Sequence, residues 1–405
     1  MRNLLVLFVD GDAQLLKSLA RLIATKRLNW SARFAGSGKE ALRVLDEQEC
    51  DVIITDASLK DMSGSVLLNQ VKEQHSLILR ILLTEQVDHS LISSLLKSAH
   101  QLLAKPCPLD QLVEAIECAI SLRSLYMNPA VRRIIYRMEH LPVVPRIYLE
   151  LTQELRKKDC APNSLGAIIA RDMGLTAGVL KMVNSPFFGL SRRIESPQQA
   201  VSFIGVSILK GLVIYEQIFK ALNPANYPDF DVERLWEHSL NAARCCKAVV
   251  KHEGGSGKEL DSAFSAGLLH DIGKIVLAEG CSEEYVCALQ KSRSENLPLV
   301  EAEVALLGVA HAEVGAYLLG LWGFPEPLVS AIADHHEPSR GDRPSLLTAV
   351  LHCVDVSMHD LYVQSSGYSS HFLDQGYLSR NGWENKLEKW KEIVDAELDS
   401  TIADR

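Results

Sequence analysis

Several features that would assign this chain to a familiar class are missing from its sequence. Its nine cysteines include no CxxC pair, and their odd number argues against a framework of disulfides. The apolar run Leu4 to Val9 ends at Asp10 and is far too short for a signal sequence or a membrane span, and no later run reaches membrane length. We therefore expect a cytoplasmic protein without a membrane segment.

Clusters of basic residues are also lacking. The formal net charge of −9 is spread along the chain, and no stripe of Lys and Arg could neutralise a phosphate backbone. The glycine-rich stretch HEGGSGKE, residues 252–259, has neither the preceding strand nor the GK[ST] ending of a phosphate-binding loop. The sequence thus argues against direct nucleic-acid binding and against a P-loop nucleotide site.

Alternating apolar and amphipathic segments are plentiful in the first hundred residues. With 405 residues, 47% of them hydrophobic, the chain is long enough for more than one domain of roughly 100 to 200 residues. Short apolar runs separated by helical patterns are typical of βαβ units and a buried parallel sheet. The segments, in chain order, are LLVLFV, QLLKSLARLIATK, SARFAG, GKEALRVLDEQ, DVIIT, GSVLLNQVKEQ and LRILLT.

Polar residues follow the ends of the predicted strands. Asp10 and Asp12 come after the first strand, Asp56 follows DVIIT, Thr84 follows ILL, and Lys105 precedes a proline. The carboxyl ends of parallel strands meet at one edge of a sheet, so these side chains are expected to lie close together. Clustered carboxylates bind hard cations such as Mg²⁺, while a lysine and a hydroxyl can contact a phosphoryl group.

This arrangement resembles the receiver domain of response regulators over residues 1–122. The resemblance implies a doubly wound, parallel five-stranded sheet and Mg²⁺ as cofactor. It assigns Asp56 as the phosphoacceptor, Asp10 to the acidic pocket, Thr84 as the switch hydroxyl and Lys105 as the phosphate contact. Gly64 is then the turn residue after the phosphorylation loop.

Two positions depart from the receiver pattern. Receivers carry two adjacent acids where this chain has Asp10 followed by Gly11, and the missing acid is generally a direct Mg²⁺ ligand. Whether Asp12, one residue further on, also binds the metal stays open at this point. Leu102 stands where an aromatic switch residue is usual. We therefore expect Gly11 to weaken Mg²⁺ binding and Leu102 to leave the switch without its usual aromatic half.

The remainder of the chain has helical periodicity throughout, with proline and glycine between the segments. A helical linker is expected over residues 123–138, and an all-helical domain over residues 139–360. Residues 361–405 form a predicted C-terminal helical extension. Its charged amphipathic segment, NGWENKLEKWKEIVDAELDS, packs either on its own domain or on a partner.

Histidine and aspartate recur through this helical region at positions that could converge on one centre. Imidazole and carboxylate groups are natural ligands for Fe, Mn, Zn or similar divalent ions, and a helical scaffold can point them inward. Lys274 lies four residues after His270, which predicts that both share one helical face and that Lys274 could contact a substrate phosphate. The candidate metal ligands are His238, His270, Asp271, His311, His335, His336 and Asp355.

The pattern resembles the HD superfamily of metal-dependent phosphohydrolases. The segment RDMGLTAGVLKMVNSPFFG followed by IESPQQAVSFIG is similar, more specifically, to the HDOD output domain. That resemblance implies a regulatory rather than a catalytic domain. After His336 the chain reads EPSRGDRPS and lacks the Gly-Tyr-Pro motif of the related cyclic-di-GMP phosphodiesterases.

Together, the two resemblances predict a two-component response regulator. A sensor histidine kinase or another phosphodonor would modify Asp56, and the HDOD domain would bind a downstream signalling protein. A homodimer is compatible with this reading.

Two alternatives stay open. One is a metal-dependent phosphohydrolase that acts on a nucleotide or cyclic dinucleotide, with Lys274 as candidate catalytic residue. The other is a phosphorylation-independent adaptor in which both sites are vestigial buried networks.

Overall fold

The computed structural model describes most of the chain. The described residues are 4–25, 28, 30–75, 78–84, 98–105, 107–121, 128–137, 147, 150–151, 154–155, 157, 160–183, 194–206, 208–213, 231–322, 324–341, 344–366 and 372–403. Part of the HDOD-like signature, residues 184–189, lies outside them.

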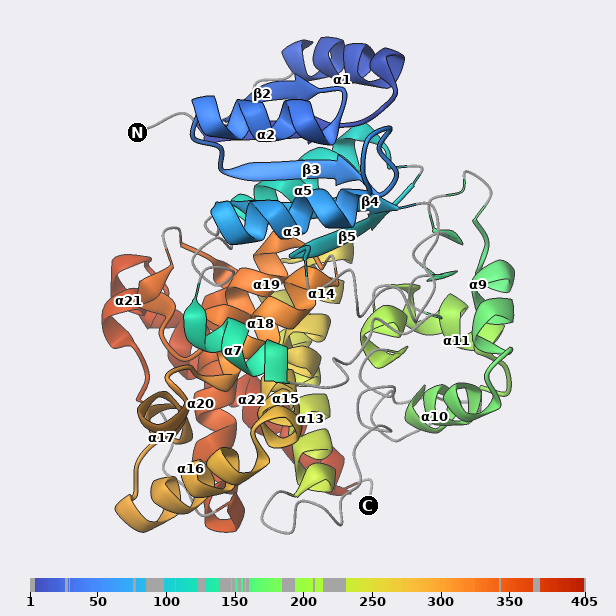
Figure 1. Cartoon of the computed structure of the whole chain (residues 1–405). Coiled ribbons are helices and arrows are strands. Elements are labelled where there is room, and N and C mark those ends of the chain that lie inside the picture. Colours follow the sequence, from blue (N-terminus) through green and yellow to red (C-terminus); the bar gives the residue numbers. More distant parts are fainter. Residues whose placement is uncertain are drawn as a thin grey trace. The chain divides into compact units, whose positions relative to one another are not determined.

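The chain divides into two compact units (Figure 1), which are described separately. The first comprises Met1–Val143 together with Tyr317–Glu326, and the second comprises Val144–Ala316 and Pro327–Arg405.

A five-stranded sheet forms the centre of the first unit. Its strand order is β2-β1-β3-β4-β5, and every neighbouring pair is parallel. The predicted α/β receiver fold, with five parallel strands, is thereby confirmed. The strands are β1 (Leu4–Val9), β2 (Trp30–Ala35), β3 (Val52–Asp56), β4 (Leu79–Thr84) and β5 (Gln101–Ala104).

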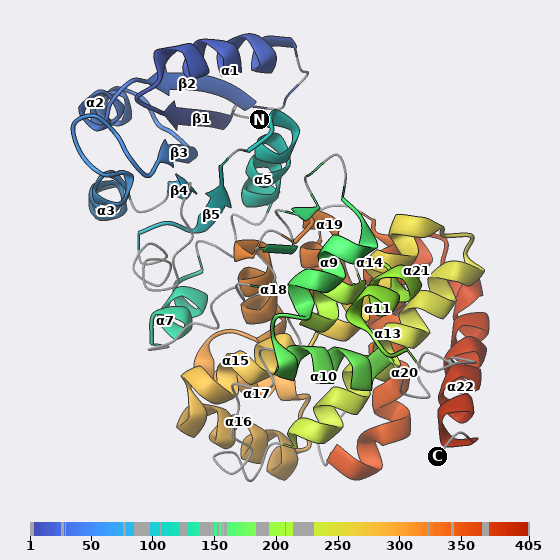
Figure 2. The ribbon, with the colours of Figure 1, turned by 90° about the vertical axis from the view of Figure 1, so that its right-hand side faces the viewer.

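Helices cover both faces of this sheet, α2 and α3 one face and α1 and α5 the other (Figure 2). The hydroxyls of Ser37 and Ser63 accept backbone hydrogen bonds at the starts of α2 and α3, which satisfies donors that have no partner inside the helix. With both faces covered, β3 and β4 are buried almost throughout, as their continuous apolar runs predict. The helices are α1 (Ala13–Thr25), α2 (Gly38–Glu47), α3 (Gly64–Gln74) and α5 (Leu109–Ser121).

The strand order places a topological switch point between β1 and β3, because the chain runs outward in opposite directions from these two strands. In doubly wound sheets, ligands bind outside the carboxyl ends of the strands at such a point. Asp10 directly follows β1, and Asp56 is the last residue of β3. The fold thus brings two of the predicted pocket residues to the expected crevice.

The second unit is helical in the part that the structure describes. Its all-α prediction is confirmed. The helices from residue 162 onward are α9 (Pro162–Ile169), α10 (Met173–Val183), α11 (Pro197–Ile204), α13 (Val232–His252), α14 (Gly257–Leu269), α15 (Ile272–Gly280), α16 (Ser282–Glu295), α17 (Leu299–Leu307), α18 (His311–Leu321), α19 (Glu326–Ala333), η3 (Pro338–Arg340), α20 (Leu346–Ser366), α21 (Gln375–Arg380), η4 (Glu384–Lys386) and α22 (Leu387–Ala403). The end of α18 and the first residue of α19 belong to the range Tyr317–Glu326, which is grouped with the first unit.

The C-terminal helix α22 packs on its own domain, against α13 and α20. The indole Nε1 of Trp390 donates a 2.9 Å hydrogen bond to Glu253, and Arg244 of α13 pairs with Glu397 at 2.9 Å. Trp390 is among the largest fully buried side chains. Of the two open alternatives for the C-terminal segment, the structure therefore shows packing on its own domain. Helix α20 continues through residue 360, where the sequence analysis placed a domain limit, without a break.

Only part of the predicted linker falls on described residues. Helix α5 ends at Ser121, and a separate helix, α7, covers Pro129–Arg137. The domain limits proposed from the sequence remain a prediction.

In the described part of the chain, no single helix has the length and apolar composition that a membrane crossing requires. One bent pair of helices, Leu299–Leu307 with His311–Gly320, meets both requirements when the two helices are taken together.

Candidate functional site

The structure assembles the predicted receiver pocket around one lysine. The Nζ atom of Lys105 lies 3.1 Å from Oδ2 of Asp10 and 3.0 Å from Oδ1 of Asp56. Burial opposes the charged form of Lys105, but its hydrogen bonds to both aspartates outweigh this and raise its pKa. Thr84 is buried at the end of β4, where its carbonyl accepts the Lys105 backbone N–H.

The loop between β3 and α3 closes against the backbone of Asp56. The N–H of Gly64 donates to the carbonyl of Ala57 at 2.9 Å, and a Cβ at Gly64 would lie 2.1 Å from the carbonyl oxygen of Asp56. Only glycine permits this approach, so Gly64 lets α3 start directly beside the candidate phosphoacceptor.

Asp12 faces the helix rather than the pocket. Its Oδ1 accepts hydrogen bonds from the backbone N–H groups of Gln14 and Leu15, at 2.8 and 3.2 Å, which makes it the cap of α1. No hydrogen bond or ion pair joins it to Lys105 or Asp56, all three being described residues. Beside Gly11, where the second acid of a receiver would stand, the aliphatic stem of Lys60 lies 3.4 Å from the Cβ position.

These contacts test how well Mg²⁺ fits. The ion prefers octahedral oxygen coordination, with one or two carboxylates and several waters. Asp10 and Asp56 are available, although Asp10 Oδ1 also accepts the Asp12 backbone N–H at 2.8 Å. The pocket therefore fits an Mg²⁺ ion with two carboxylate ligands, one fewer than the receiver resemblance implies.

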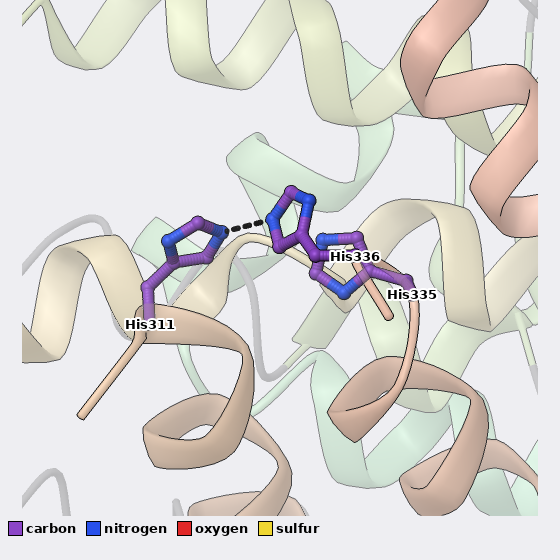
Figure 3. A group of neighbouring side chains, drawn as sticks. All are labelled: His311, His335 and His336. Carbon is purple, nitrogen blue, oxygen red and sulfur yellow. Dashed lines mark hydrogen bonds between the residues drawn. The ribbon is translucent and has the colours of Figure 1, made fainter. Parts of the chain in front are cut away.

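The second unit gathers all seven candidate metal ligands into one buried cluster. Each comes from a different part of the chain or from a helix end: His238 from α13, His270 and Asp271 from the break between α14 and α15, His311 from the start of α18, His335 and His336 from the residues after α19, and Asp355 from α20. Figure 3 shows His311 facing His336, with His335 beside it. Sequence spacing alone could not have shown that these elements meet.

The donor atoms lie close enough to share metal ions. His238 Nε2 is 3.1 Å from His270 Nε2, and His336 Nε2 is 2.9 Å from His311 Nε2. Asp355 Oδ1 lies 3.4 Å from His238 Nε2. Three sets of ligand atoms each fall within 4.8 Å: His311, His335 and His336; His238, His270 and Asp355; and His270, Asp271 and His335.

Hydrogen bonds to backbone carbonyls fix the orientation of two imidazole rings. His270 Nδ1 bonds the carbonyl of Gly267 at 2.8 Å, and His335 Nδ1 bonds that of Ile332 at 2.7 Å. A carbonyl can only accept, so each Nδ1 must carry the hydrogen. The lone pair of the neutral ring is then on Nε2. In His335 that atom is buried and has no hydrogen-bond partner among the described residues.

Burial and charge act in opposite directions on this cluster. Burial lowers the pKa of His238 to about 4 and holds that of His335 well below its ordinary value. Burial also opposes ionisation of Asp271, but the neighbouring His270, Lys274 and His311 outweigh it and keep its pKa well below the usual range. A carboxylate and imidazoles without a proton on Nε2 are the forms that bind a metal.

The prediction that His270 and Lys274 share one helical face is wrong. Helix α14 ends at Leu269 and α15 begins at Ile272, so the chain breaks between the two residues. The buried Lys274 ammonium instead pairs with Asp271 Oδ2 at 2.6 Å. The break also brings Gly273 of α15 close to the start of α18, since a Cβ at Gly273 would lie 1.9 Å from the His311 carbonyl oxygen.

Two residues near the cluster were missed by the sequence analysis. Glu303 of α17 is fully buried and binds His311, and His352 of α20 donates from Nδ1 to the His335 carbonyl at 2.6 Å. The signal for Glu303 was a lone acid among apolar neighbours on the buried side of LVEAEVALL. His352 lies three residues before Asp355, one turn away on the same helix.

The donor types and their spacing in the cluster fit a divalent transition metal. An unpartnered, fully buried imidazole nitrogen costs free energy unless a ligand covers it. His335 Nε2 is such an atom, and its neighbours are imidazoles and carboxylates, the donor types suited to Zn, Fe or Mn.

Comparisons with known proteins agree with both units. The response regulator receiver domain model matches residues 6–117, and the HDOD domain model matches residues 141–338. An uncharacterized protein of Treponema pallidum is 27% identical over 200 residues, which is 49% of this chain and 38% of that protein. The transcriptional regulatory protein YdfI of Bacillus subtilis is 31% identical over 32% of this chain and 61% of its own length.

These curated relatives are each matched over less than two thirds of their length. Among solved structures, an HDOD domain protein of unknown function from Geobacter sulfurreducens is 24% identical, with a TM-score of 0.52. The match covers 68% of this chain and 94% of that one, and it shows a shared fold.

A parallel sheet with a phosphoacceptor-type pocket, on a chain that also carries a helical His/Asp cluster, defines a two-component signalling regulator. The chain belongs to the response regulators that combine an N-terminal receiver domain with a C-terminal HDOD domain, a relative of the HD superfamily.

Proposed function

We propose that phosphorylation of Asp56 controls the HDOD domain of this regulator. The observation that carries the proposal is the position of Lys105 between Asp10 and Asp56, within about 3 Å of both carboxylates. A phosphodonor, such as a sensor histidine kinase, would transfer its phosphoryl group to a carboxylate oxygen of Asp56. Mg²⁺ bound by Asp10 and Asp56 would screen negative charge during the transfer.

The chain's own residues then respond to the added charge. A phosphoryl group attracts the Lys105 ammonium more strongly than a carboxylate does, so Lys105 would shift its contacts from Asp10 toward the phosphate. The buried Thr84 at the neighbouring strand end would offer its hydroxyl. Phosphorylation can change the output only through interactions that differ between the two states, and these two residues supply such a difference.

The test uses full-length protein incubated with acetyl phosphate and Mg²⁺. Intact-mass analysis is expected to show one added phosphoryl group in the wild type and none in Asp56→Asn. Hydrogen exchange should then change within residues 231–403 of the phosphorylated protein. Phosphorylation without any such change would contradict control of the HDOD domain, and absence of phosphorylation would contradict the proposal at its first step.

We propose further that the HDOD domain acts by binding a downstream signalling protein, in the cytoplasm where its kinase would also act. The HDOD assignment supports this output. Phosphorylated and unphosphorylated protein should differ in the partner they retain, whereas a phosphorylation-independent adaptor would retain the same partner in both states and in Asp56→Asn.

The buried histidine cluster favours a second candidate, a metal-dependent phosphohydrolase. A bound metal would supply an activated water and neutralise a phosphate, and Lys274 would hold a phosphate oxygen once released from Asp271. His238, whose side chain is 17% exposed, is the most exposed of the seven ligands and marks the side from which a substrate would enter. Turnover of a nucleotide or cyclic dinucleotide by the metal-loaded wild type, lost in His270→Ala with Asp271→Ala, would establish this activity.

A further inference from the structure

One carboxylate of the second unit lies buried without belonging to the candidate ligand set. Glu303 has no exposed surface, whereas Glu301 on the same helix, α17, faces solvent. A buried carboxylate is costly unless hydrogen bonds and charges compensate it. The group that compensates the buried Glu303 carboxylate therefore indicates the role of this residue.

That group is the metal-ligand candidate His311. Glu303 Oε2 accepts the His311 backbone N–H at 2.8 Å and lies 2.7 Å from its Nδ1. Facing a carboxylate, Nδ1 carries a hydrogen. Nε2, on the opposite side of the ring, also faces a carboxylate and binds a metal only after its own hydrogen has left. There it lies 3.1 Å from Asp271 Oδ1 and 2.9 Å from His336 Nε2.

The Glu303 contact differs from the anchors of the neighbouring rings. His270 and His335 are held through Nδ1 by neutral backbone carbonyls, Gly267 and Ile332. A carboxylate at the same position pulls more strongly on the Nδ1 hydrogen and makes Nε2 a better electron-pair donor. It also prevents the ring from rotating out of the cluster.

We propose that Glu303 is a positioning residue of the HDOD metal centre, which orients His311 and strengthens its bond to the metal without touching the metal itself. The inference rests on the proposed metal centre. It makes α17, a helix without a predicted ligand, part of the site.

A purely structural role is the competing explanation, because the same carboxylate accepts the first backbone N–H of α18. Glu303→Gln separates the two roles. The amide oxygen can still accept the backbone hydrogen bond, while the negative charge is lost. Glu301→Gln, two residues away on the exposed side of α17, is the matched control.

The experiment is a Co²⁺ titration of metal-depleted full-length protein, followed by visible absorption. Glu303→Gln is expected to weaken Co²⁺ binding by about 10- to 100-fold and to change the ligand-field bands, the range typical for removal of an outer partner of a histidine ligand. Glu301→Gln should match the wild type. Wild-type affinity and an unchanged spectrum in Glu303→Gln would overturn the inference alone, and a wild type that binds no Co²⁺ would contradict the metal centre as well.

A second measurement covers the case in which Glu303→Gln does not fold. In wild-type protein with Zn²⁺ and ¹⁵N-labelled histidine, NMR should show His311 with hydrogen on Nδ1 and zinc on Nε2. Zinc on Nδ1 of His311 would contradict the role assigned to Glu303, because Oε2 of Glu303 occupies that side of the ring.

Discussion

The acidic pocket of the receiver and the histidine cluster of the HDOD domain both gather charged residues, but they do so under different conditions. The three pocket side chains, Asp10, Asp56 and Lys105, are 9%, 17% and 19% exposed. In the cluster, Asp271 and His311 are 1% exposed and His270 not at all. The pocket side chains keep partial access to solvent, whereas the inner residues of the cluster have almost none; His238, at 17%, is the cluster residue that reaches solvent to a similar degree.

This difference indicates two kinds of site. A pocket of two partly accessible carboxylates suits a transient phosphoryl group and a weakly held Mg²⁺ ion. Buried imidazoles with fixed Nδ1 hydrogens suit a permanently bound metal, because they lose little hydration and need no rearrangement on binding. The comparison can be broken by any result that gives both sites the same metal dependence.

The largest expected effect is on stability after metal removal. If the cluster holds its metal tightly, a thousandfold excess of free metal over the dissociation constant stabilises the domain by about 4 kcal/mol. Hydrogen exchange with and without chelator should therefore show lost protection in α13 to α20 and little change in β1 to β5. Equal loss in both units would contradict the distinction.

The next largest effect is expected on the free energy of unfolding of two matched lysine variants. Lys274→Met leaves Asp271 as a buried carboxylate without its ammonium partner, which costs about 3 kcal/mol in the metal-free protein. Lys105→Met removes a partly exposed ammonium and is expected to cost about 1 kcal/mol or less. Denaturant unfolding of each variant measures both values, and a larger cost for Lys105→Met would reverse the comparison.

Restoring the missing receiver acid should sharpen the Mg²⁺ difference. Gly11→Asp adds a third carboxylate beside Asp10, and a Cβ there meets only the Lys60 stem at 3.4 Å, an ordinary contact. Calorimetric titration is expected to show Mg²⁺ binding about tenfold tighter, or about 1.4 kcal/mol, with Gly11→Ala as the control. Unchanged affinity would mean that the absent acid is not what limits Mg²⁺ binding.

The smallest effect is expected at Asp12. Since its carboxylate caps α1, Asp12→Asn should keep the cap and change the free energy of unfolding by less than about 0.5 kcal/mol. Mg²⁺ affinity should equal that of the wild type. A clear loss of Mg²⁺ binding would place Asp12 among the ligands after all.

Local patterns predicted most of the fold. The apolar runs located β1, β3 and β4, and the helical periodicity located the all-α unit. Strand β5 has only four residues, Gln101–Ala104, too few to form a recognisable run, and was expected only from the receiver resemblance. The break at His270–Asp271 was missed because apolar residues continue on both sides of it without a proline.

The sites were predicted by residue type but not by geometry. Strand ends indicated that Asp10 and Asp56 would meet, and the receiver resemblance added Lys105. The capping role of Asp12 and the contact of Glu303 with His311 depend on hydrogen bonds and on a packing arrangement between α17 and α18. Such contacts leave no periodic trace in a sequence.

The most direct test of the account is elemental analysis of the full-length protein, purified without chelator and without a nickel affinity step. The account predicts near-stoichiometric transition metal in the wild type, its loss in His270→Ala with Asp271→Ala, and its retention in Asp56→Asn. Absence of metal from the wild type would contradict the account and leave the HDOD domain as a metal-free binding module.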